Sequence, residues 1–145
     1  MKHPINNHPV IQSYIRYNNF GREVGMEFEL TEPGQIIYKV EITEKVLATP
    51  RAAHGGFVAT LMDATLGVAA LSLVCEEDQL VSTVELSVNY LAPALLGDHL
   101  TADAVCISRG KRLLYFEGKI RNQTGKVIAA GKGTFNAYPA IKANL

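Results

Sequence analysis

Between Arg51 and Glu76 the chain carries one charged side chain, that of Asp63. Apolar residues recur at positions i, i+3 and i+4 from Val58 onward, which predicts one long helix. A helix that is apolar on every side has to be enclosed by protein. The stretch is long enough to cross a membrane, but a central carboxylate and flanks without a Lys/Arg bias argue against that. We therefore expect a buried core helix and no membrane association.

The segments around this helix alternate apolar and polar side chains, as half-buried strands do. The predicted strands cover 24–30, 36–43, 81–91, 100–108, 113–121 and 126–135. A short amphipathic helix is expected at 9–19, ending before Gly21. These elements predict an α+β fold in which a curved antiparallel sheet wraps around a long central helix. We expect a single domain over residues 1–145, with an N-terminal helical extension at 1–21.

A single sheet has only one concave face. The other side of a helix that is apolar all round would therefore stay uncovered in a monomer. A second copy of the chain would cover it, which predicts a homodimer. The alternative is that the N-terminal helix covers this face instead.

Charge and cysteine content narrow the function further. Fourteen basic side chains balance fourteen acidic ones, so no positive field favours nucleic acid. Cys75 and Cys106 form no metal-binding pattern, and a lone pair of cysteines suggests a reducing, cytoplasmic location. The first twenty residues lack the apolar run of a signal peptide. We expect no metal and no cofactor.

Asp63 is the first candidate functional residue. A carboxylate inside an enclosed helix is unfavourable unless it finds partners. The small residues Ala59 and Gly67, one turn before and after it, leave a notch beside it. The carboxylate either binds a neighbour such as Thr60 or serves a function, and we favour function because no cation lies nearby in the sequence.

His54-Gly55-Gly56 is the second candidate. Paired glycines are unfavourable inside a helix, so they belong in its first turn, where free N–H groups can bind a carbonyl oxygen. Close packing is the alternative reason for them. Gly55 and Asp63 are eight residues apart, about 12 Å along one helix. One carbonyl cannot touch both, so a site that uses both needs Gly55 of one subunit and Asp63 of the other.

HGG followed by an aspartate nine positions after the histidine, then STVELSVNYLAP and SRGKRLLYFEGKIRNQTGKVIAAGKGTF, resembles the hotdog-fold thioesterase superfamily. Within it the chain is most similar to the PaaI-like (phenylacetic acid degradation) type, over about residues 22–136. The resemblance implies a sheet around a long helix, dimers that join into tetramers, and hydrolysis of acyl-coenzyme A thioesters.

The resemblance also implies roles for particular residues. Asp63 would be the nucleophile or the base that activates water, and the Gly55 N–H of the facing subunit would polarise the thioester carbonyl. Thr83 would hold the water or the carboxylate, and His54 would shape the loop. The expected substrate-binding residues are Gly56, Arg109, Lys111 and Arg112, of which the three basic ones would meet nucleotide phosphates. A solvated hairpin turn is the alternative for this basic cluster.

Two features of the sequence leave questions open. Strict alternation places Thr83 on the strand face opposite Val84, so we expect a bulge or an interface there. Many relatives carry an asparagine shortly before HGG, whereas this chain has Thr49 and Arg51 in that segment. An acyl-coenzyme A binding module without turnover therefore stays an alternative.

A hydratase or dehydratase that uses His54 with Asp63 is a further alternative. The sequence does not assign the acyl group. Phe28, Phe57, Met62 and Tyr90 could line either an aryl or a short aliphatic pocket, and the sequence does not decide between the two.

Overall fold

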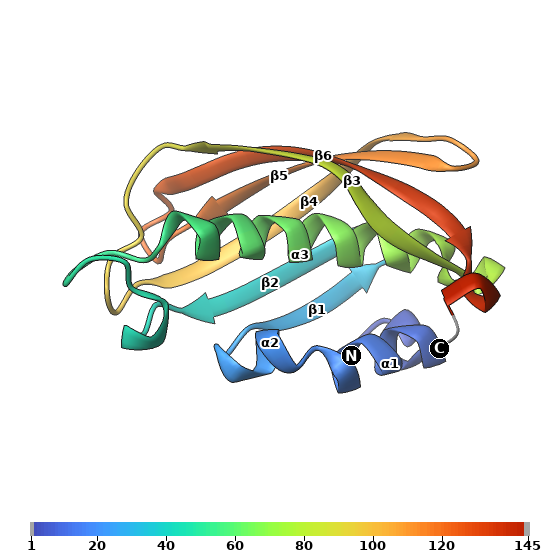
Figure 1. Ribbon diagram of the computed structural model, residues 1–145, viewed down its shortest axis with the longest axis horizontal. Helices are drawn as coiled ribbons and strands as arrows, with labels where there is room; N and C mark the ends of the chain where they lie inside the picture. Colours follow the sequence, from blue (N-terminus) through green and yellow to red (C-terminus); the bar gives the residue numbers. More distant parts are fainter. Residues whose placement is uncertain (1, 144–145) are drawn as a thin grey trace.

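The computed structural model describes residues 2–143 and shows a curved sheet wrapped around one long helix (Figure 1). All strand pairs are antiparallel, in the order β1-β2-β4-β5-β6-β3. The strands are β1 Glu27–Glu32, β2 Gln35–Glu41, β3 Gln79–Tyr90, β4 His99–Arg109, β5 Leu113–Arg121 and β6 Val127–Pro139. The helices are α1 Pro9–Tyr17, α2 Asn19–Glu23 and α3 Gly55–Val74, with 3₁₀ turns η1 Pro4–Asn7, η2 Glu44–Val46, η3 Cys75–Glu77 and η4 Ala140–Ala143. The predicted fold class is confirmed.

Glycines in the sheet allow α3 to approach it closely. A Cβ atom on Gly118 would lie 2.8 Å from Leu66, and one on Gly131 would lie 2.9 Å from Met62. Leu66 and Met62 are fully buried between helix and sheet. By length and composition the segment Gly55–Glu77 meets the criterion for a membrane span, but its most apolar window is 67% buried inside the protein. The helix is therefore the core of the fold.

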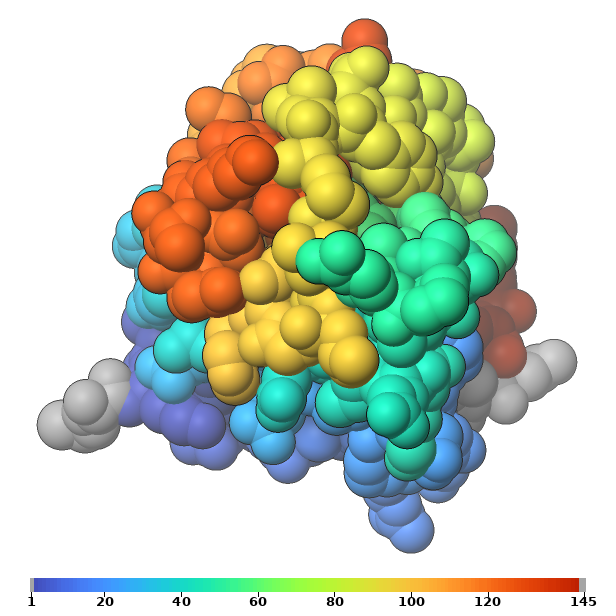
Figure 2. All heavy atoms as spheres, turned by 90° about the vertical axis from the view of Figure 1, so that its left-hand side faces the viewer, coloured from blue at the N-terminus to red at the C-terminus, as the bar shows by residue number. Residues whose placement is uncertain are grey.

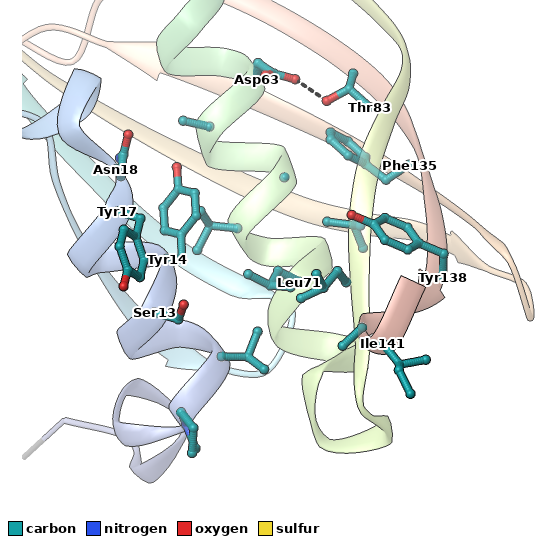
Figure 3. A pocket seen from close by; sticks show the side chains of 18 residues that line it. Ser13, Tyr14, Tyr17, Asn18, Asp63, Leu71, Thr83, Phe135, Tyr138 and Ile141 are labelled. Atoms are coloured by element: carbon teal, nitrogen blue, oxygen red, sulfur yellow. Dashed lines mark hydrogen bonds between the residues drawn. The ribbon is translucent and has the colours of Figure 1, made fainter. Parts of the chain in front are cut away.

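Within one chain, the outer side of α3 is neither fully exposed nor covered by the N-terminal helix. Its outward positions, among them Ala59, Asp63 and Gly67, are half-buried within one chain. The N-terminal helix α1 does not lie flat on them; the two helices are opposite walls of one cavity (Figure 3). One chain therefore shields this face in part and leaves a cavity over it.

The expectation of one helix over 9–19 that stops before Gly21 is wrong. The first helix ends at Tyr17, Asn18 leaves the helical conformation with ψ 66°, and α2 continues through Gly21 to Glu23. The Asn18 side chain accepts a hydrogen bond from the Gly21 N–H at 3.1 Å and so caps the second helix. The amphipathic period does not reveal this cap, because the same asparagine also fits a helical position.

A bulge in β3 explains the position of Thr83. Thr83 is opposite Phe135 of β6 and Glu85 is opposite Thr134, so Val84 is an extra residue. An extra residue changes which side chains face the core on the two sides of the bulge. Thr83 lines the cavity beside α3, Leu86 packs against the core, and Val84 is 60% exposed. The expected bulge is confirmed.

Candidate active site

A cavity of about 1000 Å³ opens between α1, α3 and the end of the sheet where β3 begins (Figure 3). Its lining comes from five elements that are distant in the sequence. The lining residues are Pro9, Val10, Ser13, Tyr14, Tyr17, Asn18, Asp63, Ala64, Gly67, Val68, Leu71, Leu80, Val81, Thr83, Phe135, Tyr138, Ala140 and Ile141. Asp63 is the only acidic or basic side chain in this lining. The cavity is thus an apolar site with one carboxylate.

The Asp63 carboxylate is held by Thr83. The Thr83 hydroxyl donates to Oδ1 of Asp63 at 2.7 Å, and the two side chains point toward each other in Figure 3. Thr60, the alternative partner, instead donates to the Gly56 carbonyl of its own helix at 2.9 Å. The bulge at Val84 is what makes the Thr83 contact possible, since unbroken alternation would direct Leu86 and Thr83 to opposite faces. The structure therefore joins two of the predicted site residues.

Tyr14 is a site-lining residue that the sequence did not reveal. It lines the same cavity as Asp63, and its ring packs at 5.9 Å from Phe28, which in turn packs at 5.2 Å from Tyr38. Burial raises the pKa of the Tyr14 phenol, and the negative charge of Asp63 raises it further. Tyr14 thus presents a neutral hydroxyl close to the carboxylate.

The HGG motif forms the first turn of α3, as predicted. Nδ1 of His54 accepts a hydrogen bond from the Gly56 N–H at 2.8 Å, which makes His54 the N-cap of the helix. Within residues 2–143 the Gly55 N–H has no hydrogen-bond acceptor. The Tyr90 hydroxyl donates to the Gly55 carbonyl at 2.9 Å, a contact that the sequence did not suggest. The first turn therefore offers one exposed backbone donor.

Backbone contacts hold the segment that precedes this turn. The His54 N–H donates to the Val46 carbonyl and the Ala53 N–H to the Ala94 carbonyl, both at 2.8 Å. Figure 2 shows the two segments, near residues 50 and 94, beside each other at the end of the molecule where α3 begins. Thr49, one of the two residues that stand where many relatives carry an asparagine, accepts a hydrogen bond from the Ala52 N–H at 3.0 Å and so closes its own turn.

One chain does not bring all predicted residues together. His54, Gly55 and Gly56 lie outside the cavity that contains Asp63. Gly55 and Asp63 are separated by about 12 Å along α3, and His54 and Asp63 by slightly more. A hydratase mechanism that needs His54 and Asp63 on one substrate atom is therefore not supported within one chain.

The basic cluster lies at the opposite end of α3 from HGG, in the β4–β5 turn. Nη2 of Arg109 forms an ion pair with Glu77 at 2.8 Å, and Nη2 of Arg112 lies 3.4 Å from Oδ1 of Asn136. Lys111 is exposed. None of these three residues lines the Asp63 cavity of the same chain.

None of the side chains that could line the acyl pocket lies in the Asp63 cavity of one chain. Phe57 and Met62 are buried in the core, and neither Phe28 nor Tyr90 lines the cavity. Helical spacing alone does not show which side of α3 the sheet covers. The cavity walls come from α1, α3, β3, β6 and η4.

Comparison with known proteins agrees with this architecture. Residues 52–129 match the thioesterase superfamily model, which is more than half of the chain. The human protein acyl-coenzyme A thioesterase 13 is 30% identical over 128 residues, covering 86% of this chain and 89% of the relative. The E. coli PaaI protein superposes with a TM-score of 0.85 at 20% identity, covering 94% of this chain and 95% of that one.

A third similar structure is smu.793 from Streptococcus mutans UA159 bound to acetyl CoA. It has a TM-score of 0.72 at 27% identity and covers 79% of this chain and 89% of that chain. The family match and the human relative establish the family, and the PaaI structure establishes the fold. The chain therefore belongs to the thioesterase superfamily, with the hotdog fold of its PaaI-like members.

Proposed function

We propose that this protein hydrolyses acyl-coenzyme A thioesters, with Asp63 acting at the thioester carbonyl. The observation that carries the proposal is the position of Asp63: it is the one charged group in an apolar cavity of about 1000 Å³, oriented by Thr83. An oriented carboxylate in an apolar cleft is typical of a catalytic base or nucleophile. The human relative's name, acyl-coenzyme A thioesterase 13, supports this substrate class.

The proposed chemistry needs one carboxylate and one oxyanion donor. Thr83 holds Oδ1 of Asp63, so Oδ2 remains to attack the carbonyl carbon or to take a proton from water. In the base route the water oxygen bonds to the acyl carbon, the C–S bond breaks, and coenzyme A leaves as a thiolate that takes the proton. A thiolate is a good leaving group, so the absence of a second acid in the cavity lining fits this reaction.

The two cysteines are poor alternative nucleophiles. Burial raises the pKa of both the Cys75 and the Cys106 thiol, which keeps them protonated near neutral pH. Neither lines the Asp63 cavity. Both are free thiols, which supports the proposed cytoplasmic location.

The proposed site is completed by a second subunit. Among the described strands, β3 pairs with β6 on one side only, and its exposed residues include Val84 at 60% and Tyr90 at 55%. An unpaired edge strand is a ready surface for a second copy. Thr83 contacts Asp63 and Tyr90 contacts Gly55. Antiparallel pairing of two β3 strands about a twofold axis would bring the Thr83 end of one strand toward the Tyr90 end of the other subunit's strand.

This arrangement would bring the Gly55 N–H of one subunit toward Asp63 of the other, at two equivalent sites per dimer. The basic turn would then bind coenzyme A phosphates, with Lys111 and Arg112 as its contacts and Arg109 released from Glu77. We include a tetramer of two such dimers in the proposal, and a single domain over the whole chain.

The first test is release of free thiol from acyl-coenzyme A substrates that carry aryl groups and short, medium or long alkyl chains. Turnover of at least one class is expected. Calorimetric binding without thiol release would instead support a binding module and would refute the enzyme.

A second test addresses the shared site. Asp63→Asn and Gly55→Pro subunits are each inactive as homodimers, but a mixture contains heterodimers with one intact pair. If subunits exchange freely, mixing restores about a quarter of wild-type activity. Co-expression with two affinity tags isolates the heterodimer, and no recovery in it would contradict a site built from two chains.

A further inference from the structure

The Asp63 cavity continues far beyond the carboxylate. It follows α3 from Asp63 to Leu71, which are eight residues apart and therefore about 12 Å apart along the axis. Close to Asp63 the lining positions of this helix are small, Ala64 and Gly67, and farther away they are Val68 and Leu71. The cavity is therefore a long apolar channel with its carboxylate at one end.

Two segments distant from α3 in the sequence form the sides of this channel. The N-terminal helix contributes Val10 and Ser13, and the C-terminal turn η4 contributes Ile141. In Figure 3 Ser13 and Ile141 lie on opposite sides of the channel, at the level of Leu71 and away from Asp63. The turn is attached through the Ala140 N–H, which donates to the Asp78 carbonyl at 2.8 Å.

These side walls lie outside residues 52–129, the part of the chain that matches the family model. Ile141 is also unusual because it lines the channel although 86% of it is exposed. A large exposed apolar side chain at the mouth of an apolar channel gains free energy when an apolar ligand covers it. Among residues 2–143, no acidic or basic side chain other than Asp63 lines the channel, so this lining offers a charged ligand end no partner away from Asp63.

We infer that Ile141, together with Val10 and Ser13 across the channel, determines which acyl chains this protein selects. The inference rests on the proposed function, because Asp63 has to mark the position of the thioester carbonyl. C–C bonds of about 1.5 Å follow a zigzag, so ~12 Å corresponds to an extended acyl chain of roughly nine or ten carbons. Straight, uncharged chains of that length contact Ile141, whereas acetyl and butanoyl groups do not reach it.

The test compares kcat/KM for straight-chain substrates from acetyl- to palmitoyl-coenzyme A. In the wild type, kcat/KM rises by up to about fourfold for each methylene group buried, until the chain end passes Ile141. Ile141→Ser lowers kcat/KM for decanoyl-coenzyme A about fivefold and leaves the acetyl and butanoyl substrates unchanged. Ser13→Leu, which adds apolar surface at an exposed helical position, raises the decanoyl value a few-fold.

Ile107→Ser is the matched control, since Ile107 is a 51% exposed isoleucine of β4 that does not line the channel. It leaves the whole length profile unchanged. An Ile141→Ser effect that is equal for all chain lengths, or shared by the control, would overturn the inference while thioester hydrolysis stands. A wild type that cleaves only aryl thioesters would do the same. Absence of thiol release from every substrate would instead refute the proposed function.

Discussion

Two hydroxyl groups of β3 donate hydrogen bonds to α3, one to its first turn and one to its middle. The two contacts differ in the group that accepts the hydrogen bond. Tyr90 donates to a backbone carbonyl at 2.9 Å, whereas Thr83, itself an exposed residue, donates at 2.7 Å to a half-buried carboxylate in the lining of the cavity. A surface N–H stays hydrated until a partner covers it, but a half-buried carboxylate needs a partner at once. One half of the proposed site therefore depends on the main chain and the other on two side chains.

The largest loss of activity is expected when the carboxylate of Asp63 is replaced. Asp63→Asn keeps the shape and an acceptor for Thr83 but removes the base, so kcat falls about a thousandfold or more. Urea unfolding stays within about 1 kcal/mol of the wild type, because the hydrogen bond is retained. Thiol-release kinetics and urea titration measure the two quantities, and turnover within tenfold of the wild type would remove Asp63 from the mechanism.

The next effect belongs to the main-chain half. Gly55→Pro deletes only the N–H, since proline suits the first position of a helix and His54 before it already has φ −60° and ψ 134°. Loss of one oxyanion donor lowers kcat about a hundredfold.

Gly55→Ala is the matched control for this deletion. It keeps the N–H, and its Cβ would lie 3.5 Å from the Tyr90 ring, an ordinary contact. It therefore keeps near-wild-type kcat. Equal kinetics for the Pro and Ala variants would show that the N–H has no role.

Removal of the carboxylate's partner is expected to have a smaller effect. Thr83→Ala lowers kcat about tenfold, because a hydrogen bond to a charged group is worth about 1.5–3 kcal/mol and water replaces part of it. Thr83→Ser keeps the hydroxyl and restores most of the activity. Steady-state kinetics of the three proteins measures this, and a serine variant as slow as the alanine variant would contradict a role for the hydroxyl.

Removing the hydroxyl of Tyr90, at the first turn of α3, is expected to lower kcat less than removing that of Thr83. Tyr90→Phe removes the hydrogen bond to Gly55 in an exposed turn, so it lowers the free energy of unfolding by about 1 kcal/mol or less and kcat only a few-fold. A loss as large as that of Gly55→Pro would mean that the hydroxyl, and not the N–H, carries the function of this half.

The smallest effect is expected at Tyr38, a core residue that takes part in neither hydrogen bond. The Tyr38 hydroxyl is buried beside Tyr14 and Asn18, and burial, followed by the neighbouring Tyr14, raises the pKa of this phenol well above its usual range. The folded state therefore keeps the proton while the unfolded chain loses it near pH 10. The contribution of Tyr38 to the free energy of unfolding is therefore fully present below about pH 10 and is lost as the pH rises above it.

Tyr38→Phe makes this alkaline decline shallower and changes stability at pH 7 by less than about 1 kcal/mol. Urea unfolding at neutral and alkaline pH measures both. An unchanged alkaline decline in the variant would assign the proton to another group.

The central helix, the strands and the HGG turn follow from local patterns, and the sequence predicts them. Asp63 stands out as the one charge in an apolar run. These features depend on residues close in sequence or on a regular period, which is why pattern reasoning finds them. The contact between Asp63 and Thr83 does not follow from alternation, which the bulge breaks there, and only the family resemblance pointed to Thr83.

The walls of the cavity cannot be predicted from local patterns in the sequence. Tyr14 and Ile141 lie at opposite ends of the chain and meet across α3 only after the sheet has curved, so no local period connects them. The break between the two N-terminal helices at Asn18 cannot be predicted from the sequence pattern either, since an asparagine can occupy a helix or cap one. Periodicity also does not tell which side of a uniformly apolar helix meets the sheet, so it does not show that Phe57 and Met62 belong to the core.

In the proposed mechanism, the extra residue at Val84 makes chain length, and not only composition, a determinant of activity. Deleting it would restore the plain alternation of β3 and turn the Thr83 hydroxyl away from Asp63, with Leu86 and the rest of the core still in place. A single codon deletion in this chain would then separate the proposed catalytic geometry from the fold that carries it.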